Sequence, residues 1–178
     1  MNDLLIGDRT DDLAARCVRS LIDRGATLAV GESLTGGLLA DAFVRIPGAS
    51  QVFVAGLVTY TNSMKHALLA VSTDLLNREG AVHPDVALAM AGGVRQTTGA
   101  SVSLATTGVA GPGPADGHPA GRAHIAVMSP EFTAVREVNC DPGDQGASQR
   151  NAIRRCVVYE AVALLAEALV VPNREKQM

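Results

Sequence analysis

The sequence contains no tryptophan, and aromatic residues make up only 3% of the chain. Proteins that bind single-stranded nucleic acid stack bases on aromatic side chains, so this composition argues against such a function. The formal net charge of −3 gives no basic excess that would attract a nucleic acid. No apolar run approaches the roughly 20 residues that span a bilayer, and no basic-then-apolar leader opens the sequence. We therefore expect a cytoplasmic, globular protein that binds neither nucleic acid nor membranes.

Residues that bind metals or form disulfides are also scarce. The odd number of cysteines and their wide spacing favour reduced thiols over a disulfide framework or a zinc site. The three cysteines are Cys17, Cys140 and Cys156. The four histidines, His66, His83, His118 and His124, show neither HxH nor HExxH spacing. We expect no catalytic metal and no other cofactor; only His118, in a glycine-rich loop, is placed to contact a ligand.

A hydrophobic fraction of 47% in 178 residues predicts that residues 1–178 form one packed domain. Helical and strand-like patterns alternate along it. Helices are predicted over 11–24, from the end of GESLTGG to about 45, from about 63, over 84–97 and over 147–169. Strands are predicted over 26–30, 51–60, 101–106, 123–128 and 132–138. The pattern predicts an α/β fold, a three-layer α/β/α sandwich with a mixed sheet covered by helices.

The segment GESLTGG, residues 31–37, lies between a predicted strand and a predicted helix. If Thr35, Gly36 and Gly37 begin that helix, their backbone N–H groups are open to an anion, and the glycines allow close approach. Ser33 would project at the same crossing, where a hydroxyl acts as a nucleophile if a base lies nearby. Serine and threonine also cap helices without any ligand, so both interpretations stand at this point.

Two further segments put polar residues after predicted strands. Tyr60 and Lys65 follow the second strand, where ligands of open α/β sheets bind. Lys65 can act as a base only if its pKa, about 10.4 in a free side chain, is lowered; the alternative is a solvated lysine. The segment TTGVAGPGP, residues 106–114, is glycine-rich but matches neither the Walker phosphate loop nor the dinucleotide fingerprint GxGxxG.

Five blocks in this order carry a resemblance: GESLTGG, VTYTNSMK, GAVHPDVA, TTGVAGPGP and the PGD of residues 142–144. Together they resemble the C-terminal domain family of the competence/damage-inducible protein CinA, over about residues 10–170. This family includes stand-alone nicotinamide-nucleotide amidohydrolases. The resemblance implies metal-independent hydrolysis of nicotinamide mononucleotide to nicotinate mononucleotide and ammonia, a step of the pyridine nucleotide cycle. It also implies a homo-oligomer.

Site roles follow from the resemblance motif by motif. Ser33 is the implied nucleophile, Lys65 its base and later proton donor, and Tyr60 an orienting or relaying residue. Ser50, in the block Gly48-Ala49-Ser50, stays as an alternative nucleophile. The resemblance implies that backbone amides near Thr35 to Gly37 stabilise the oxyanion and that those from Gly108 to Gly111 bind the phosphate or ribose. The two segments could also have the opposite roles. The implied substrate-binding residues are Thr35, Gly36, Gly37, Ser50, Asn62, Thr107, Gly108, Gly111 and Arg150.

The sequence departs from the family pattern at several positions. Gly31 and Leu34 replace the usual alanine and cysteine of the first block, and His83 replaces a serine. Gln145 stands where an arginine commonly follows PGD, so phosphate binding would fall to Arg150 or Arg154. These departures keep two other functions open. One is a nucleotide-binding or regulatory module without catalysis, and the other is a partner-binding domain.

Overall fold

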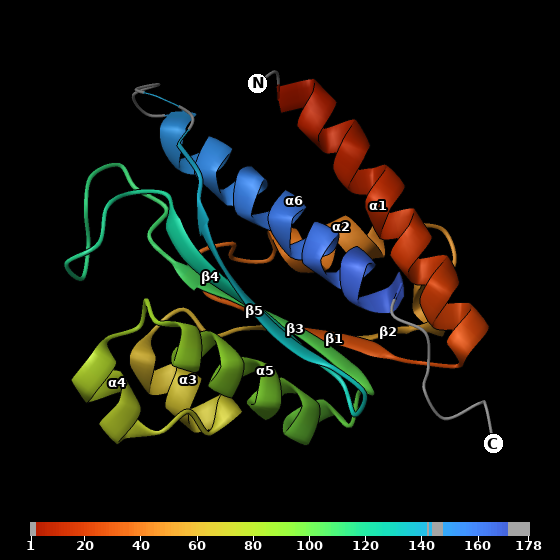
Figure 1. Ribbon diagram of the computed structural model, residues 1–178, viewed down its shortest axis with the longest axis horizontal. Helices are drawn as coiled ribbons and strands as arrows, with labels where there is room; N and C mark the ends of the chain where they lie inside the picture. Colours follow the sequence, from red (N-terminus) through yellow and green to blue (C-terminus); the bar gives the residue numbers. More distant parts are fainter. Residues whose placement is uncertain (1–2, 142, 144–147, 171–178) are drawn as a thin grey trace.

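The computed structural model describes residues 3–141, 143 and 148–170 (Figure 1). The helices are α1 (Asp3–Arg24), α2 (Leu38–Val44), the short 3-10 helix η1 (Ala49–Gln51), α3 (Asn62–Leu69), α4 (Thr73–Glu79), α5 (Pro84–Thr98) and α6 (Gln149–Val170). The strands are β1 (Leu28–Glu32), β2 (Phe53–Val58), β3 (Val102–Gly108), β4 (Arg122–Met128) and β5 (Thr133–Asn139). Every predicted strand is present within a few residues of its expected bounds, whereas α4 was not predicted.

The five strands form one mixed sheet in the order β2-β1-β3-β4-β5. β1 pairs in parallel with β2 on one side and with β3 on the other, while β4 and β5 are added in antiparallel fashion. All five residues of β1 are buried, as expected of a central parallel strand. The mixed α/β sheet is therefore confirmed, and β1 lies at the centre of its parallel half.

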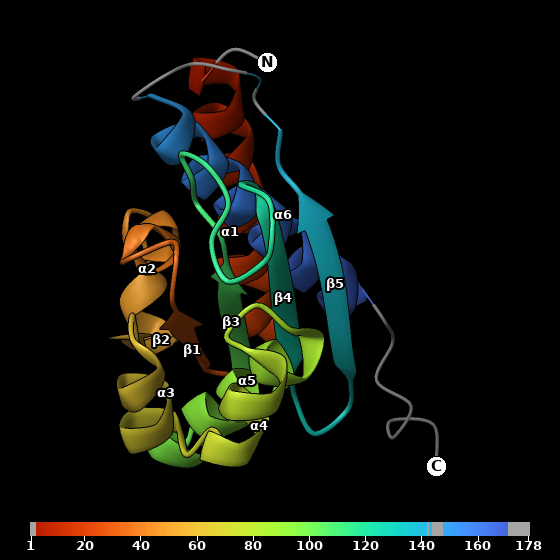
Figure 2. The same cartoon turned by 90° about the vertical axis from the view of Figure 1, so that its left-hand side faces the viewer.

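Helices cover both faces of the sheet, giving three layers (Figures 1 and 2). α1, α2 and α6 pack on one face around a core that includes Phe43, Ile125 and Leu165. α3, α4 and α5 pack on the other face around Leu69, Met90 and their neighbours. In the part of the chain that the structure describes, no helix is both long enough and apolar enough to cross a membrane.

The helices that position the site have local start and stop signals. His83 Nδ1 accepts the N–H of Asp85 at 3.2 Å to cap α5, and Pro84 occupies the first turn. Gly99 ends this helix at a φ of 70°, in the left-handed region that glycine favours. Inside α5, a Cβ on Gly93 would lie 1.9 Å from the carbonyl oxygen of Leu69. Glycine at this position therefore lets α5 contact the end of α3.

The expectation that all three cysteines are reduced was wrong. Cys140, after β5, and Cys156, on α6, form a disulfide across 16 positions of the chain, with their Cα atoms 6.1 Å apart. Cys17 is buried and free, as predicted for it. Counting and spacing could not reveal the pair, because it is formed by the packing of α6 beside β5.

Candidate active site

Ser33 follows the last residue of β1, and both neighbouring strands hold the backbone there. The Ser33 N–H donates to the carbonyl oxygen of Thr106 at 3.0 Å, on the β3 side. On the β2 side, the Thr59 N–H donates to the carbonyl oxygen of Glu32 at 2.8 Å. The sheet hydrogen bonding thus continues past the end of the strand, and it fixes the backbone from which the Ser33 side chain extends.

The turn after Ser33 is closed by the carboxylate of Glu32, which is fully buried. Glu32 accepts the N–H groups of Gly37, Leu39 and Ala40 at 2.9, 3.1 and 2.9 Å. A carboxylate at this position caps α2, which begins only at Leu38. The expectation that Thr35–Gly37 begins the helix was therefore wrong.

The proposed anion site over residues 35–37 is corrected as well. Gly37 donates its N–H to Glu32, and Gly36 donates its N–H to the carbonyl oxygen of Ser33 at 3.2 Å. The Thr35 hydroxyl contacts that of Thr106 at 2.9 Å, in the buried interior. None of the three lines the cavity beside Ser33. They shape the turn that presents Ser33, and the N–H groups of Gly36 and Gly37 already have partners inside the protein.

Arg154, on α6, also holds the turn that follows Ser33. Its guanidinium donates to the carbonyl oxygens of Leu34 at 3.1 Å and Thr35 at 2.8 Å. It does not line the cavity. Arg154 therefore holds the backbone of this turn, and of the two arginines expected to bind phosphate only Arg150 is at the cavity.

Lys65 reaches Ser33 from α3. The Thr61 hydroxyl caps this helix by accepting the Met64 N–H at 3.3 Å, and Lys65 follows in the first turns. Its side chain is only 1% exposed. The ammonium nitrogen lies 3.0 Å from Ser33 Oγ, and it also donates to the carbonyl oxygens of Thr59 at 3.1 Å and Tyr60 at 3.4 Å. The end of β2 thus holds the amine against the hydroxyl.

Burial changes the acid–base chemistry of this amine. Loss of hydration lowers the pKa of Lys65 from 10.5 to about 8, and the negative charge of Asp116 acts in the opposite direction. A lysine with a pKa near 8 is partly neutral close to physiological pH. The sequence analysis required a lowered pKa if Lys65 is to act as a base. Burial of the amine provides it.

A cavity of about 350 Å³ opens over this serine–lysine pair. Its volume lies at the lower end of the range of pockets that bind small molecules. It is formed where β1, β2 and β3 end, and the loop 109–121 stands over this end of the sheet (Figure 2). The lining residues are Ser33, Leu34, 60–62, Lys65, Ala81, Val82, 107–116 and Arg150.

Tyr60 and Arg150 meet at this cavity. Arg150, on α6, donates to the Tyr60 hydroxyl at 2.6 Å and to the carbonyl oxygen of Gly111 at 2.6 Å. Tyr60 is 55% exposed, and its hydroxyl contacts Arg150 while its carbonyl oxygen contacts Lys65. The structure therefore places the phenol with the arginine, and the backbone of Tyr60 orients the lysine.

Four other predicted substrate-binding residues line the cavity: Asn62, Thr107, Gly108 and Gly111. The Thr107 hydroxyl donates to the carbonyl oxygen of Ala81 at 2.7 Å, which ties the end of β3 to the segment before α5. Its oxygen retains lone pairs that can accept a hydrogen bond from a ligand.

Ser50 does not belong to the site. It is exposed in η1, directly before β2, whereas Ser33 follows the end of β1. Because β1 and β2 are parallel and Leu28 at the start of β1 bonds to Val52, Ser50 lies at the opposite end of the sheet. Ser50 therefore does not line this cavity, and the structure places it away from Ser33 and Lys65.

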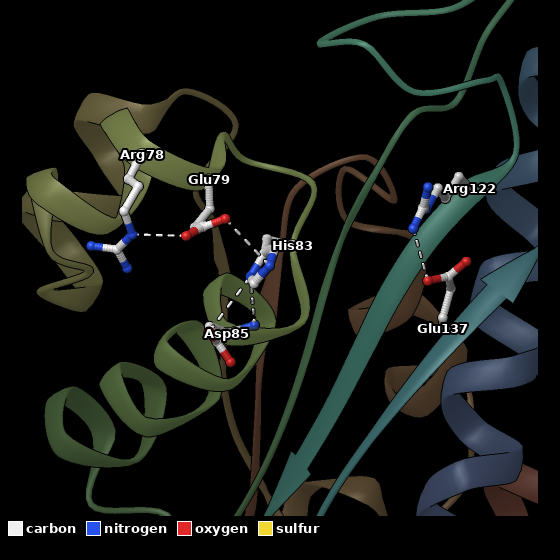
Figure 3. A network of polar contacts seen from close by, with 6 residues as sticks. All are labelled: Arg78, Glu79, His83, Asp85, Arg122 and Glu137. Atoms are coloured by element: carbon white, nitrogen blue, oxygen red, sulfur yellow. Dashed lines mark hydrogen bonds and ion pairs between the residues drawn. The ribbon is translucent and has the colours of Figure 1, made fainter.

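The histidines do not line the cavity either. Figure 3 shows His83 beside Glu79 and Asp85, at 3.6 and 3.7 Å, so it caps α5 and faces these carboxylates. His118 lies in the loop 109–121 without lining the cavity. Within the described residues there is no cluster of three potential metal ligands. The PGD block and Gln145 fall outside the described residues, apart from Gly143.

Sequence reasoning missed two contributors to the site. Asp116 lines the cavity and acts electrostatically on Lys65. Thr59 supplies a carbonyl oxygen to the ammonium, a contact that any residue type could make. An Asp-Gly pair inside a glycine-rich loop is a turn signal, and this signal could have directed attention to Asp116.

Comparison with known proteins gives one consistent family. The model of the CinA C-terminal domain matches residues 10–169. A CinA-like protein of Frankia casuarinae is 44% identical over 170 residues, 95% of this chain and 38% of that protein. The chain thus spans less than two fifths of the length of this curated relative.

Two solved structures have a similar fold over most of both chains. One, of the competence/damage inducible protein CihA from Agrobacterium tumefaciens, has a TM-score of 0.82 at 36% identity, over 90% of this chain and 95% of that one. The other, of the competence damage-inducible protein A (ComA) from Klebsiella pneumoniae, has a TM-score of 0.84 at 32% identity, over 92% of this chain and 99% of that one.

The lowered pKa of Lys65 predicts a specific pH dependence of stability. The unfolded chain binds the lysine proton more tightly than the folded protein, so the free energy of unfolding rises with pH between about 8 and 10.5. The full gain across that window is on the order of 3 kcal/mol. Chemical denaturation of wild type and of Lys65→Met at pH 7 to 11 measures it, because the difference between them cancels the other titrating groups. A pH-independent difference would contradict the lowered pKa.

Proposed function

This chain belongs to the CinA C-terminal domain family, and on that premise we propose that it hydrolyses the carboxamide of nicotinamide mononucleotide. The products would be nicotinate mononucleotide and ammonia. The activity is the one implied by the motifs GESLTGG and VTYTNSMK, whose serine and lysine meet at the cavity.

The observation that carries this proposal is the 3.0 Å contact between Lys65 Nζ and Ser33 Oγ at the floor of the cavity. A serine hydroxyl becomes a useful nucleophile when an adjacent base accepts its proton, and serine–lysine pairs are a known form of this arrangement. With the pKa of Lys65 near 8, the neutral form of the amine has a lone pair that can take the proton of the Ser33 hydroxyl.

The proposed reaction has two steps. Ser33 Oγ attacks the carboxamide carbon as its proton passes to Lys65, and the C–N bond then breaks as Lys65 returns the proton to the departing ammonia. Water next attacks the acyl-enzyme ester, giving up a proton to Lys65. Cleavage of the ester bond returns this proton to Ser33 and releases the carboxylic acid, which loses its remaining proton to solvent as the carboxylate product.

The oxyanion of each tetrahedral intermediate requires hydrogen-bond donors. Gly36 and Gly37 use their N–H groups within the turn, so the candidates are cavity-lining backbone amides. The N–H groups of Leu34, Ala110 and Gly111 bond to no other group in the part of the chain that the structure describes. We assign the oxyanion to this set, in which Leu34 directly follows the nucleophile.

The phosphate is assigned to Arg150. Its guanidinium lines the same cavity from α6, and contacts to Tyr60 and Gly111 set its orientation. A guanidinium can offer two parallel donors to a phosphate, which makes it a strong and directional anchor.

A prediction on turnover tests the serine–lysine pair. Ser33→Ala and Lys65→Ala should each reduce ammonia release from nicotinamide mononucleotide by at least about 10³-fold, because the nucleophile and its base act as one unit. The measurement is an ammonia assay with purified protein and no added metal. Ser50→Ala is the matched control, and it should keep wild-type turnover because Ser50 lies at the other end of the sheet.

Near-normal turnover in both Ser33→Ala and Lys65→Ala would disprove the proposal. No turnover by folded wild-type protein, with calorimetry showing that the nucleotide binds, would support the non-catalytic binding module instead. Neither turnover nor binding at millimolar nucleotide would favour a partner-binding domain.

A second prediction concerns the phosphate. Arg150→Gln should raise the KM for nicotinamide mononucleotide by about 10- to 100-fold, since a hydrogen bond to a charged group contributes about 1.5–3 kcal/mol. The KM for nicotinamide riboside, which lacks the phosphate, should change far less. Arg19→Gln on α1 is the control for charge. Equal losses for both substrates would mean that Arg150 shapes the cavity without binding the phosphate.

A further inference from the structure

The loop 109–121 holds one acidic residue, Asp116, in a rigid turn. The Ala115 N–H donates to the carbonyl oxygen of His118 at 3.0 Å, and the His118 N–H donates to that of Ala115 at 2.9 Å. Between them, Asp116 and Gly117 have φ values of 52° and 77°. Two central residues at positive φ, flanked by residues that exchange two backbone hydrogen bonds, define a type I′ hairpin turn. Asp-Gly and Asn-Gly pairs favour this turn. The backbone position of Asp116 therefore does not depend on its charge.

The Asp116 side chain belongs to the cavity. It lines the cavity together with Ser33 and Lys65, and its charge acts on Lys65. Its carboxylate makes no hydrogen bond or ion pair with any residue that the structure describes. A negative charge thus lines the cavity that holds Ser33 and Lys65, and it makes no hydrogen bond or ion pair with any described residue.

A positive charge lines the same cavity. Arg150 comes from α6, whereas Asp116 comes from the loop after β3. Beside the titrating amine of Lys65, the cavity therefore carries the charges of Arg150 and Asp116, of opposite sign, on two separate elements. A ligand with an anionic group and a cationic group complements this arrangement better than a ligand with either charge alone.

We propose that Asp116 is a specificity-determining residue that selects a ligand with a positively charged ring and disfavours one in which a carboxylate replaces the carboxamide. The inference rests on the proposed function, in which the substrate ring is a pyridinium. Hydrolysis turns a neutral amide into a carboxylate, so the product has one more negative charge near Asp116 than the substrate. The same residue thus favours substrate binding and product release.

The test uses ligand pairs that differ by one charge. One pair is nicotinamide mononucleotide and benzamide riboside 5′-monophosphate, whose ring is neutral; the other is nicotinamide mononucleotide and nicotinate mononucleotide. Dissociation constants are measured by calorimetry in the Ser33→Ala background, which prevents turnover. Adding Asp116→Asn should reduce each preference for nicotinamide mononucleotide by about tenfold, the effect expected of one charge several ångströms away in a partly solvated site.

Asp116→Gly and Asp12→Asn are the control variants that separate the effect of the charge from a change in structure. Asp116→Asn creates the Asn-Gly pair that best suits the same turn, and Asp116→Gly also tolerates the positive φ. Both should lose the preferences equally if charge is the cause. Asp12→Asn, on α1, makes the same change in net charge away from the cavity and should leave the preferences intact.

The outcomes separate this inference from the proposed function. Unchanged preferences in Asp116→Asn, or a loss only in Asp116→Gly, would overturn the role of the charge even if wild-type protein releases ammonia. A loss of both preferences in a protein that releases no ammonia would support the charge selection while overturning the amidohydrolase. If none of the three nucleotides binds, both proposals fail.

Discussion

The site depends on the burial of one amine. Lys65 is 1% exposed, and loss of hydration lowers its pKa to about 8, which is what the proposed role of Lys65 as a base toward Ser33 requires. The protein offsets part of that cost with three oxygen contacts, from Ser33, Thr59 and Tyr60. Two of the three are backbone carbonyls at the end of β2, so the position of the amine is set by the sheet and by the start of α3. In the proposed reaction, this destabilising group supplies the base.

The rest of the architecture holds the partner of this amine in place. Ser33 follows the central parallel strand, and its backbone is bonded to β3 on one side while the residue before it is bonded to β2 on the other. The buried Glu32 carboxylate closes the turn after Ser33, and Arg154 holds the carbonyl groups of the same turn from α6. Glycine at position 93 allows α5 to contact α3, which carries Lys65. In the proposed reaction, a nucleophile and a base held by this many elements would need little reorganisation.

Much of this arrangement is predictable from the sequence, since hydrophobic periodicity locates the strands and the carboxyl ends of parallel strands meet at one edge. Ser33, Tyr60 and Lys65 each follow such a strand, which predicts that they lie at one edge of the sheet, whereas their joint role was implied only by the family resemblance. Other features depend on contacts between distant segments. Glu32 accepts the helix amides, Ser50 lies at the opposite end of the sheet, and Cys140 bonds to Cys156 only because α6 packs beside β5. The place of Asp116 at the cavity depends on how the loop after β3 folds back, which local patterns do not encode.

The most direct test of this account is the pKa of Lys65 itself. The sequence contains two lysines, Lys65 and Lys176, so a protein labelled with carbon-13 lysine should give two side-chain signals, and Lys176→Arg assigns them. A titration followed by NMR at the Cε atom should give a midpoint near 8 for Lys65. A midpoint near 10.4, the value of a free lysine, would contradict the claim that burial prepares this amine to accept a proton from Ser33.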